Sequence, residues 1–279
     1  MSPSFLPSNL LGYAPRLRLE IRRSRYTVKS VENVGELEQV LRLRHEVYYR
    51  ELLGTSAPAS VDTDAFDALC DHMMIAENDS GRVVGTYRLN ASSFNKRFYS
   101  QKEFRIGKIL ALPGGKLEIG RACIHRDFRN GAVFSLLWRG VLEYRSRVGA
   151  RYLFGCSSIP VTDPARGAAI YRYLWEKYPA PPGLRVEPRW FRRLPGFSRF
   201  RKFFQKKSAS EIFELASQEM GGHESLAKLV SELLLFYLRA GAVICGPPAL
   251  DKVFRCIDFF TLIDLEQVGD RARRHFRIA

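Results

Sequence analysis

The spacing of apolar and polar residues changes several times along the chain, and each change marks an element. Alternation over residues 26–31, 72–76 and 82–89 predicts strands, with a hairpin turn at 78–81. Apolar residues recur at helical spacing over 35–48 and 131–149, which predicts two amphipathic helices. Further strands are expected at 116–124, 151–159, 242–246 and 254–264, and further helices at 164–178, 210–220 and 224–239.

The remaining segments set the expected domain organisation. Residues 1–24, interrupted by Pro7 and Pro15, are typical of a poorly ordered or loosely docked leader. Residues 54–68 favour a loop, and 90–115 a loop with a short helix at best. We therefore expect a mixed α/β core over 25–180 and a basic, aromatic C-terminal lobe over 181–279 that completes the fold.

Composition narrows the class of protein. The 279 residues are 46% hydrophobic and 26% charged, as in an ordinary globular protein. No apolar run reaches the roughly 18–20 residues of a membrane span, and the N-terminus does not resemble a signal peptide. We expect a protein that stays in the cytoplasm or at the cytoplasmic face of the membrane. The five cysteines, an odd number without a C-x-x-C pair, predict free buried thiols and no metal site.

Positive charge is concentrated in three runs. Lys plus Arg exceed Asp plus Glu by 44 − 29 = 15, with clusters at 16–25, 185–207 and 271–277. The segment 185–207 mixes nine basic residues with six aromatic ones, and its phenylalanines at 200–204 have helical spacing. Such a mixture is typical of an anionic membrane surface, an acidic protein partner or nucleic acid, or of a solvated rim around core aromatics. No recognised nucleic-acid motif accompanies it, so we expect no nucleic-acid partner.

Several catalytic motifs are absent. The chain contains no H-x-x-x-x-D pair, no G-x-S-x-G elbow, no P-loop and no G-x-G-x-x-G. What remains is Glu118 and Arg121 inside an apolar strand, where charges are seldom buried unless paired. Their spacing places them on opposite faces unless a bulge at Gly120 restores a common face. A structural salt bridge stays an open alternative.

A basic glycine turn follows this strand. Arg129, Asn130 and Gly131 lead directly into the predicted helix at 131–149. Backbone N–H groups at a helix N-terminus favour phosphate groups, so the turn is a candidate anion site. Many helix starts have a similar composition, and the signal is weak by itself.

Strand, glycine turn and helix together resemble the GNAT acyltransferase fold, in which two central strands splay apart. A longer set of segments is similar to the ornithine N-acyltransferase family over residues 40–262. These include RLRHEVYYREL (42–52), DTDAFDALCDHMMI (62–75), VVGTYRL (83–89), KLEIGRACIHRDFRNGAV (116–133), YLFGCSSIP (152–160) and GPPALDKVFRCIDFF (246–260). Acyl-homoserine-lactone synthases share fewer of these residues with the chain. The resemblance implies a GNAT-like mixed sheet flanked by helices, with a basic C-terminal extension.

The resemblance also implies a reaction and roles for residues. A 3-hydroxyacyl chain would move from the 4′-phosphopantetheine of acyl carrier protein to the α-amine of ornithine, with no bound cofactor and no metal. Glu118 would act as the base, with Arg121 beside it. The expected amino-acid-binding residues are Arg44, Tyr48, Asp64, Asp67 and Arg88. Those expected to hold the acyl-pantetheine arm are Ala122, Cys123, Ile124, Arg129, Asn130, Gly131, Ala132 and Val133.

The implied partners are acyl carrier protein, ornithine and an O-acyltransferase that acts on lyso-ornithine lipid. The anionic inner face of the cytoplasmic membrane is a further expected partner. Two alternatives stay open. One is an N-acyl amino acid synthase that uses glycine, glutamine, lysine or tyrosine. The other is a non-catalytic, haemolysin-like membrane-binding protein.

Overall fold

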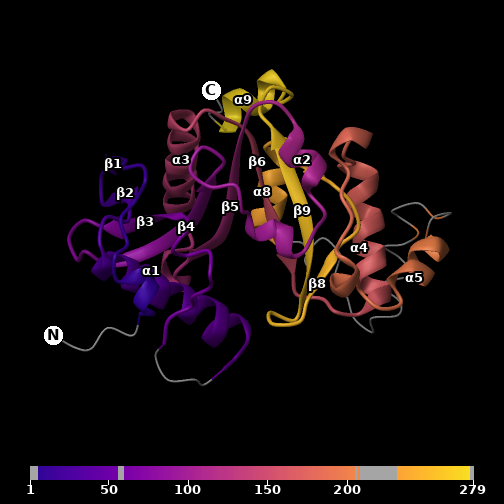
Figure 1. Cartoon of the computed structure of the whole chain (residues 1–279), viewed down its shortest axis with the longest axis horizontal. Helices are drawn as coiled ribbons and strands as arrows, with labels where there is room; N and C mark the ends of the chain where they lie inside the picture. The colour runs from indigo at the N-terminus through magenta and orange to yellow at the C-terminus, as the bar shows by residue number, and fades with distance from the viewer. Residues whose placement is uncertain (1–5, 56–59, 205–206, 208–210, 212–230, 277–279) are drawn as a thin grey trace. The chain divides into compact units, whose positions relative to one another are not determined.

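The structure is a computed structural model that describes residues 6–55, 60–204, 207, 211 and 231–276. It contains two compact units (Figure 1). The first comprises Met1–Phe98 and Gly114–Arg151, and the second Tyr99–Pro113 and Tyr152–Ile278. The inserted segment Tyr99–Pro113 therefore packs with the C-terminal half of the chain, a long-range association that composition does not indicate.

The first unit is built on an antiparallel sheet. Its strands are β1 (Glu20–Arg23), β2 (Tyr26–Ser30), β3 (Asp71–Glu77), β4 (Val83–Ala91) and β5 (Gly115–Ile124), paired in that order. The predicted hairpin joins β3 to β4, and Gly81 in its turn has φ of 67°, a conformation that glycine adopts without strain. The strand predictions for this half of the chain are confirmed.

Two helices cover opposite faces of this sheet. Neighbouring residues of a strand point to opposite faces, and Met73 and Met74 of β3 show which helix covers each. Gly140 of α3 (Gly131–Arg147) lies against Met73, whereas Met74 joins the core cluster of α1 (Val34–His45). A π-helical turn, Glu46–Leu52, continues α1. The predicted helices at 35–48 and 131–149 are confirmed.

The expected leader needs correction for residues 6–24. Leu6, Leu10 and Tyr13 are buried in the core cluster of α1, and residues 20–23 form β1. The backbone N–H groups of Arg16 and Leu17 donate to the Asp71 carboxylate at 2.8 and 3.0 Å. These contacts join segments 54–55 residues apart and leave no periodic pattern in the sequence.

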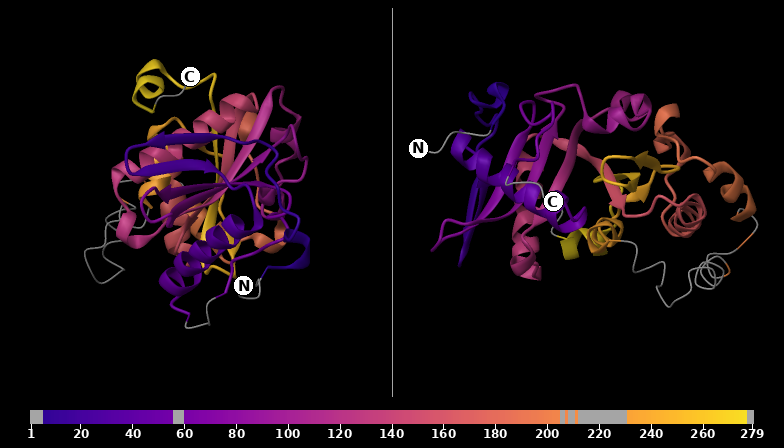
Figure 2. Two further views of the ribbon diagram at one scale, coloured as in Figure 1. Left: turned by 90° about the vertical axis from the view of Figure 1, so that its left-hand side faces the viewer. Right: turned by 90° about the horizontal axis from the view of Figure 1, so that it is seen from below.

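The second unit is built around β9 (Cys256–Asp264). This strand pairs antiparallel with β6 (Ala150–Ile159), β7 (Val243–Ile244) and β8 (Ala249–Asp251). Its helices are α2 (Gly107–Ala111), α4 (Pro164–Lys177), α5 (Phe197–Phe204), α8 (Glu232–Arg239) and α9 (Asp270–Phe276), with α4 and α5 side by side (Figures 1 and 2). Helical spacing at 200–204 indicated α5, whereas the sequence pattern missed β8 and α9.

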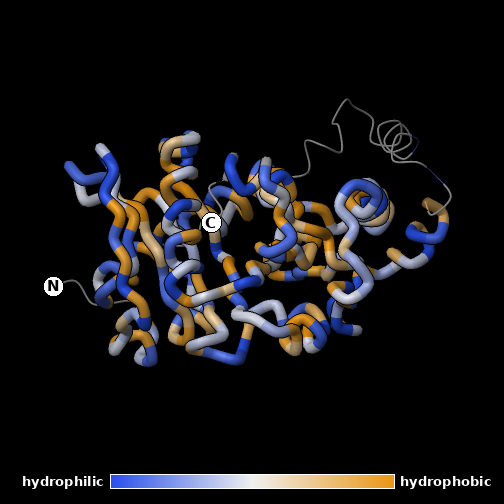
Figure 3. The backbone as a smooth tube through the Cα atoms, turned by 90° about the horizontal axis from the view of Figure 1, so that it is seen from above, coloured by the Kyte–Doolittle hydropathy of each residue, from blue (hydrophilic) through white to orange (hydrophobic). Residues whose placement is uncertain are grey.

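Two predicted helices lie largely outside the described residues. These are the helix at 210–220, of which only residue 211 is described, and the first part of the helix at 224–239. The five cysteines are free, and Cys70, Cys123, Cys245 and Cys256 are buried. Hydrophobic and hydrophilic stretches alternate along the backbone (Figure 3), and β9 is buried from Cys256 to Ile263. Among the described helices, none combines the length and apolarity that crossing a membrane requires.

Candidate active site

A β-bulge interrupts the pairing of β4 and β5 at the centre of the candidate site. Thr86 lies opposite Cys123, and Arg88 lies opposite Gly120, so two residues of β5 oppose one residue of β4. The extra residue is at Arg121–Ala122, immediately after Gly120, and Arg121 has φ of 50°. A non-glycine residue in this conformation costs about 1–3 kcal/mol and persists only where its surroundings hold it. The predicted bulge is present, but its strained residue is the arginine.

The register places Glu118 on the same face of the sheet as Arg88. Glu118 lies opposite Asn90, and residues two apart on a strand share a face. The bulge restores Arg121 to this face, because Arg121 and Arg88 both bind Asp64. The side chain of Glu118 is buried, with 6% of its surface exposed. The structure therefore brings a buried carboxylate and two arginines onto the face covered by α1.

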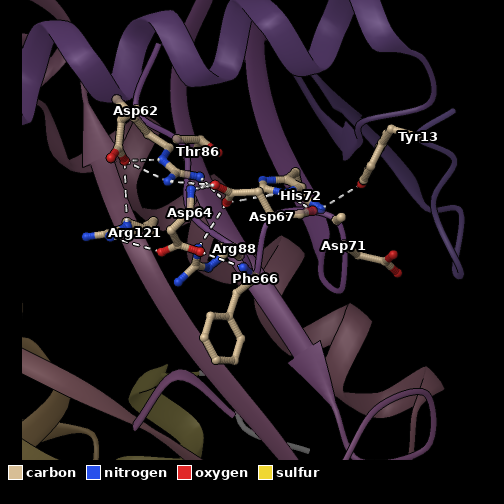
Figure 4. A network of polar contacts seen from close by, with 12 residues as sticks. Tyr13, Asp62, Asp64, Phe66, Asp67, Asp71, His72, Thr86, Arg88 and Arg121 are labelled. Atoms are coloured by element: carbon tan, nitrogen blue, oxygen red, sulfur yellow. Dashed lines mark hydrogen bonds and ion pairs between the residues drawn. The ribbon is translucent and has the colours of Figure 1, made fainter. Parts of the chain in front are cut away.

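Arg44 of α1 forms the buried centre of the charged cluster. It is 0% exposed, and its guanidinium donates to Asp62 and Asp67, each at 2.7 Å. Arg88, which lies on β4, donates a hydrogen bond to the Asp67 carboxylate at 2.9 Å (Figure 4). Buried charges of both signs are thus paired, as burial requires. Asp62, which the sequence analysis did not single out, is an equal partner of Asp67.

The outer edge of the cluster is formed by Asp64 and Arg121. Asp64 accepts hydrogen bonds from Arg88 at 2.7 Å and from Arg121 at 3.1 Å. Its side chain is 17% exposed and that of Arg121 14%, whereas Arg44 and Asp67 are fully buried. Burial raises the pKa of Asp64, but the neighbouring arginines outweigh that effect and hold it below its usual value. Asp64 and Arg121 are therefore the members of the cluster that solvent reaches most easily.

His72 supports Asp67 from β3. Its Nε2 lies 3.0 Å from the Asp67 carbonyl, which only accepts, so the imidazole carries its proton on Nε2. The backbone N–H of His72 donates to the Tyr13 hydroxyl at 3.0 Å (Figure 4). Burial lowers the pKa of His72 to about 4. The residue is neutral in the folded protein at neutral pH.

This burial predicts a pH-dependent stability. Between pH 6.5 and about 4 the unfolded chain binds a proton at His72 that the folded protein does not. Stability therefore falls as the pH falls through that window, by about 3 kcal/mol. Urea unfolding at a series of pH values measures it. In the variant His72→Asn this part of the pH dependence of the unfolding free energy should be absent. An unchanged pH dependence would contradict the lowered pKa of His72.

The bulge of β5 is held from the helical side. The Tyr48 hydroxyl donates to the Ala122 carbonyl at 2.8 Å. Cys123 is buried, and burial raises the pKa of its thiol to about 12. The thiol is protonated at neutral pH, which disfavours a role for Cys123 as a nucleophile.

The glycine turn adopts the expected geometry of a helix start. The Asn130 side chain accepts the Val133 N–H at 3.0 Å, and the residues from Arg129 to Ala132 are exposed. The first turn of α3 contains no acidic residue. Arg129 donates to the Ile124 carbonyl and pairs with Glu51 at the surface. The anion-favouring end of α3 is therefore accessible from solvent.

The chain is similar to known acyltransferases. Residues 43–139 match the model of the Acetyltransferase (GNAT) domain family. The matched segment begins in the last turn of α1 and includes the bulged strand and the glycine turn. The L-ornithine N(alpha)-acyltransferase of Agrobacterium fabrum is 31% identical over 86% of this chain and 80% of its own. That of Rhodobacter capsulatus is 27% identical, over 90% of this chain and 94% of its own.

Solved structures give a weaker likeness. The AHL synthase LasI is 14% identical with a TM-score of 0.49, over 90% of this chain and 95% of its own. The domain match and the curated relatives together show a GNAT-like α/β fold and an acyltransferase. At 31% identity over four fifths of the relative from Agrobacterium fabrum, the chain belongs to the L-ornithine N(alpha)-acyltransferase family.

Proposed function

We propose that the protein transfers a 3-hydroxyacyl chain from acyl carrier protein to the α-amine of ornithine, which gives lyso-ornithine lipid. The observation that carries this proposal is the position of Glu118. This buried carboxylate shares the face of β5 with the strained Arg121 and the charged cluster. A buried carboxylate beside a charged cluster is suited to act as a general base on an amino-acid substrate.

The proposed reaction is a direct aminolysis of a thioester. Glu118, directly or through one water, removes a proton from the α-ammonium, and the neutral amine attacks the thioester carbonyl. A C–N bond forms, the C–S bond breaks, and the pantetheine sulfur leaves with a proton. Backbone N–H groups at Ala122–Ile124 would stabilise the oxyanion. Asp64 and Arg121, at the exposed edge of the cluster, would orient the substrate, and Arg44, Asp67, Arg88 and Tyr48 would hold them in place.

The donor is expected to approach the N-terminus of α3. Its phosphodiester would bind the N–H groups at Gly131 and Ala132 and displace the exposed Glu51 from Arg129. Arg82, stacked on Phe128, and the exposed Arg126 add positive charge around this turn. An acidic carrier protein would be steered to such a surface, and the net charge of +15 favours its approach. No cofactor needs to stay bound between turnovers.

The second unit offers a surface suited to an anionic bilayer at the inner face of the cytoplasmic membrane. Trp190, Phe191 and Phe203 are 73%, 49% and 58% exposed. Arg199, Arg201 and Lys202 accompany Phe203 on α5. Exposed aromatic rings beside basic residues are typical of interfacial binding. A single-chain product with a free 3-hydroxyl would pass from there to an O-acyltransferase.

The double substitution Trp190→Ser with Phe203→Ser tests this surface. We expect the unchanged protein to sediment with phosphatidylglycerol vesicles at low salt, and the double variant to bind on the order of tenfold more weakly, because it loses two apolar anchors. Phe94→Ser, at a 42% exposed phenylalanine of the first unit, is the control and should bind normally. Equal binding by the double variant, or no binding by the unchanged protein, would refute the membrane proposal.

A panel of amino acids separates this function from that of a sibling N-acyl amino acid synthase. The purified protein is incubated with 3-hydroxymyristoyl carrier protein and ornithine, glycine, glutamine, lysine or tyrosine. Ornithine should give the highest kcat/KM, and a different preferred acceptor would support the sibling. Membership of an acyltransferase family disfavours the non-catalytic alternative.

A further inference from the structure

Asn90 of β4 faces Glu118 across the candidate site. The two residues lie directly opposite each other in the pairing of β4 with β5. Side chains in this position share a face of the sheet, and their Cβ atoms are about 4.5–5.5 Å apart. Arg88, two residues before Asn90, reaches the charged cluster from the same face. Asn90 is therefore a close neighbour of the proposed base, and both belong to the first unit.

The orientation of the Asn90 amide is fixed by a bond to the chain that follows β4. Its Nδ2 donates to the Arg97 carbonyl at 2.8 Å. A carbonyl only accepts hydrogen bonds, so the NH₂ group must face Arg97 and the oxygen Oδ1 must point away from it. Asn95 also donates to this carbonyl, at 3.0 Å. The direction of Oδ1 is thus set by the fold.

The Asn90 oxygen is a deeply buried acceptor. Asn90 is 2% exposed, and its Oδ1 has no hydrogen-bond partner among the described residues. A buried amide oxygen requires a hydrogen-bond donor. An ionised Glu118 offers only acceptor oxygens and cannot supply one. A group with two donors between the two side chains would satisfy both.

A water molecule is the donor that fits this place. It has two O–H groups, one for Asn90 and one for Glu118, and buried waters that join such groups are a regular part of folded proteins. Glu118 is 6% exposed, whereas the side chains of Asp64 and Arg121 at the edge of the cluster are 17% and 14% exposed. An acceptor held at that edge would meet the deeper carboxylate through the water.

The other titratable groups on this face do not take the place of Glu118. Burial is the main cause that raises the pKa of the Cys70 thiol to about 12, and the charge of Glu118 adds to it, so the thiol keeps its proton at neutral pH. Lys116 is two residues before Glu118 on β5, and burial lowers the pKa of its ammonium. The positive charges of Arg88 and Lys116 favour the ionised form of Glu118, which is the form that accepts a proton.

We propose that Asn90 is a positioning residue whose Oδ1 holds the water through which Glu118 takes the proton of the acceptor amine. This inference rests on the proposed function and adds the path of the proton. The water donates to Asn90 and to Glu118, which leaves a lone pair of its oxygen for the amine N–H. The ammonium gives its proton to the water oxygen while the water passes one of its own protons to Glu118. The amine is then neutral, the water is restored, and Asn90 neither gains nor loses a proton.

A crystal structure of the unchanged protein tests the water site without any assay. One ordered water should lie within about 3.2 Å of both Asn90 Oδ1 and a Glu118 oxygen. That water should be absent in the structure of Asn90→Leu, which keeps the approximate size of the side chain and removes its polar atoms. A direct hydrogen bond from a protonated Glu118 to Asn90, or an Oδ1 that faces no water, would overturn the proposal.

Kinetics tests the relay itself. Asn90→Leu should lower kcat about 10- to 100-fold, because the water is no longer held in line. The KM for ornithine should change less than about twofold, because Asp64 and Arg121 remain. In mixtures of ordinary and heavy water, kcat of the unchanged protein should fall along a curve, since two protons move in one step, and kcat of Asn90→Leu along a straight line.

Asn95→Ala is the matched control. It removes another bond to the Arg97 carbonyl, leaves Asn90 in place and should behave like the unchanged protein. An equal loss of kcat in both variants, or full activity in Asn90→Leu, would overturn the relay and leave the proposed function intact. Asn90→Ala replaces Asn90→Leu if that variant does not fold. An unchanged protein that does not acylate ornithine would refute the proposed function, and with it the proton path.

Discussion

Glu118→Gln is expected to lower kcat for acyl transfer by about 10²- to 10⁴-fold, the usual contribution of a positioned general base. The substitution keeps the shape of the side chain on β5 and removes only its ability to accept a proton. The KM values for ornithine and for the acyl carrier protein should change little, because the charged cluster and the N-terminus of α3 remain. Steady-state kinetics over a range of pH measures this effect.

The control for this variant is Glu143→Gln. Glu143 is 42% exposed on α3, where it pairs with Arg147, and its loss should leave kcat unchanged. The acidic limb of the kcat/KM profile should disappear in Glu118→Gln only. Full activity in that variant, with an unaltered pH profile, would remove Glu118 from the mechanism.

Arg44→Met is expected to lower the free energy of unfolding by about 3–5 kcal/mol. The substitution leaves Asp62 and Asp67 in the core without the guanidinium that binds them both. Arg88 and Arg121 still reach these carboxylates, but each already binds Asp64. Urea unfolding measures the loss.

Arg42→Met provides a matched comparison on the same helix. Arg42 pairs with Glu38 one turn away and is 37% exposed, so its loss should cost less than about 1 kcal/mol. If both variants were destabilised to the same small extent, the buried cluster would not support the fold as we describe.

Local pattern predicted much of the fold of the first unit, because each element there has a clear period. The hairpin of β3 and β4 and the helix α3 show alternation and helical spacing directly in the sequence. The packing of residues 6–24 could not be predicted in this way, since Leu10 and Tyr13 follow no period and Asp71 binds that segment from about 55 residues away. In the second unit, β8 is three residues long, too short for alternation to be visible.

The candidate site was predicted in composition but not in arrangement. Charges within an apolar strand identified Glu118 and Arg121, the family resemblance indicated Arg88, and Gly120 indicated the position of the bulge. The sequence did not indicate that Arg121 would be the strained residue or that Asp62 would share Arg44 with Asp67. Arg44 precedes these two aspartates by 18 and 23 residues. Spacing along the chain does not report such distant pairings.

The most direct test of the central claim is the identity of the product. The protein is incubated with 3-hydroxyacyl carrier protein and ornithine that carries an isotope label on its α-nitrogen alone, and the product is analysed by mass spectrometry and NMR. Our account predicts lyso-ornithine lipid with the label in the amide and a free side-chain amine. An amide on the unlabelled nitrogen, or no acylated ornithine at all, would contradict it.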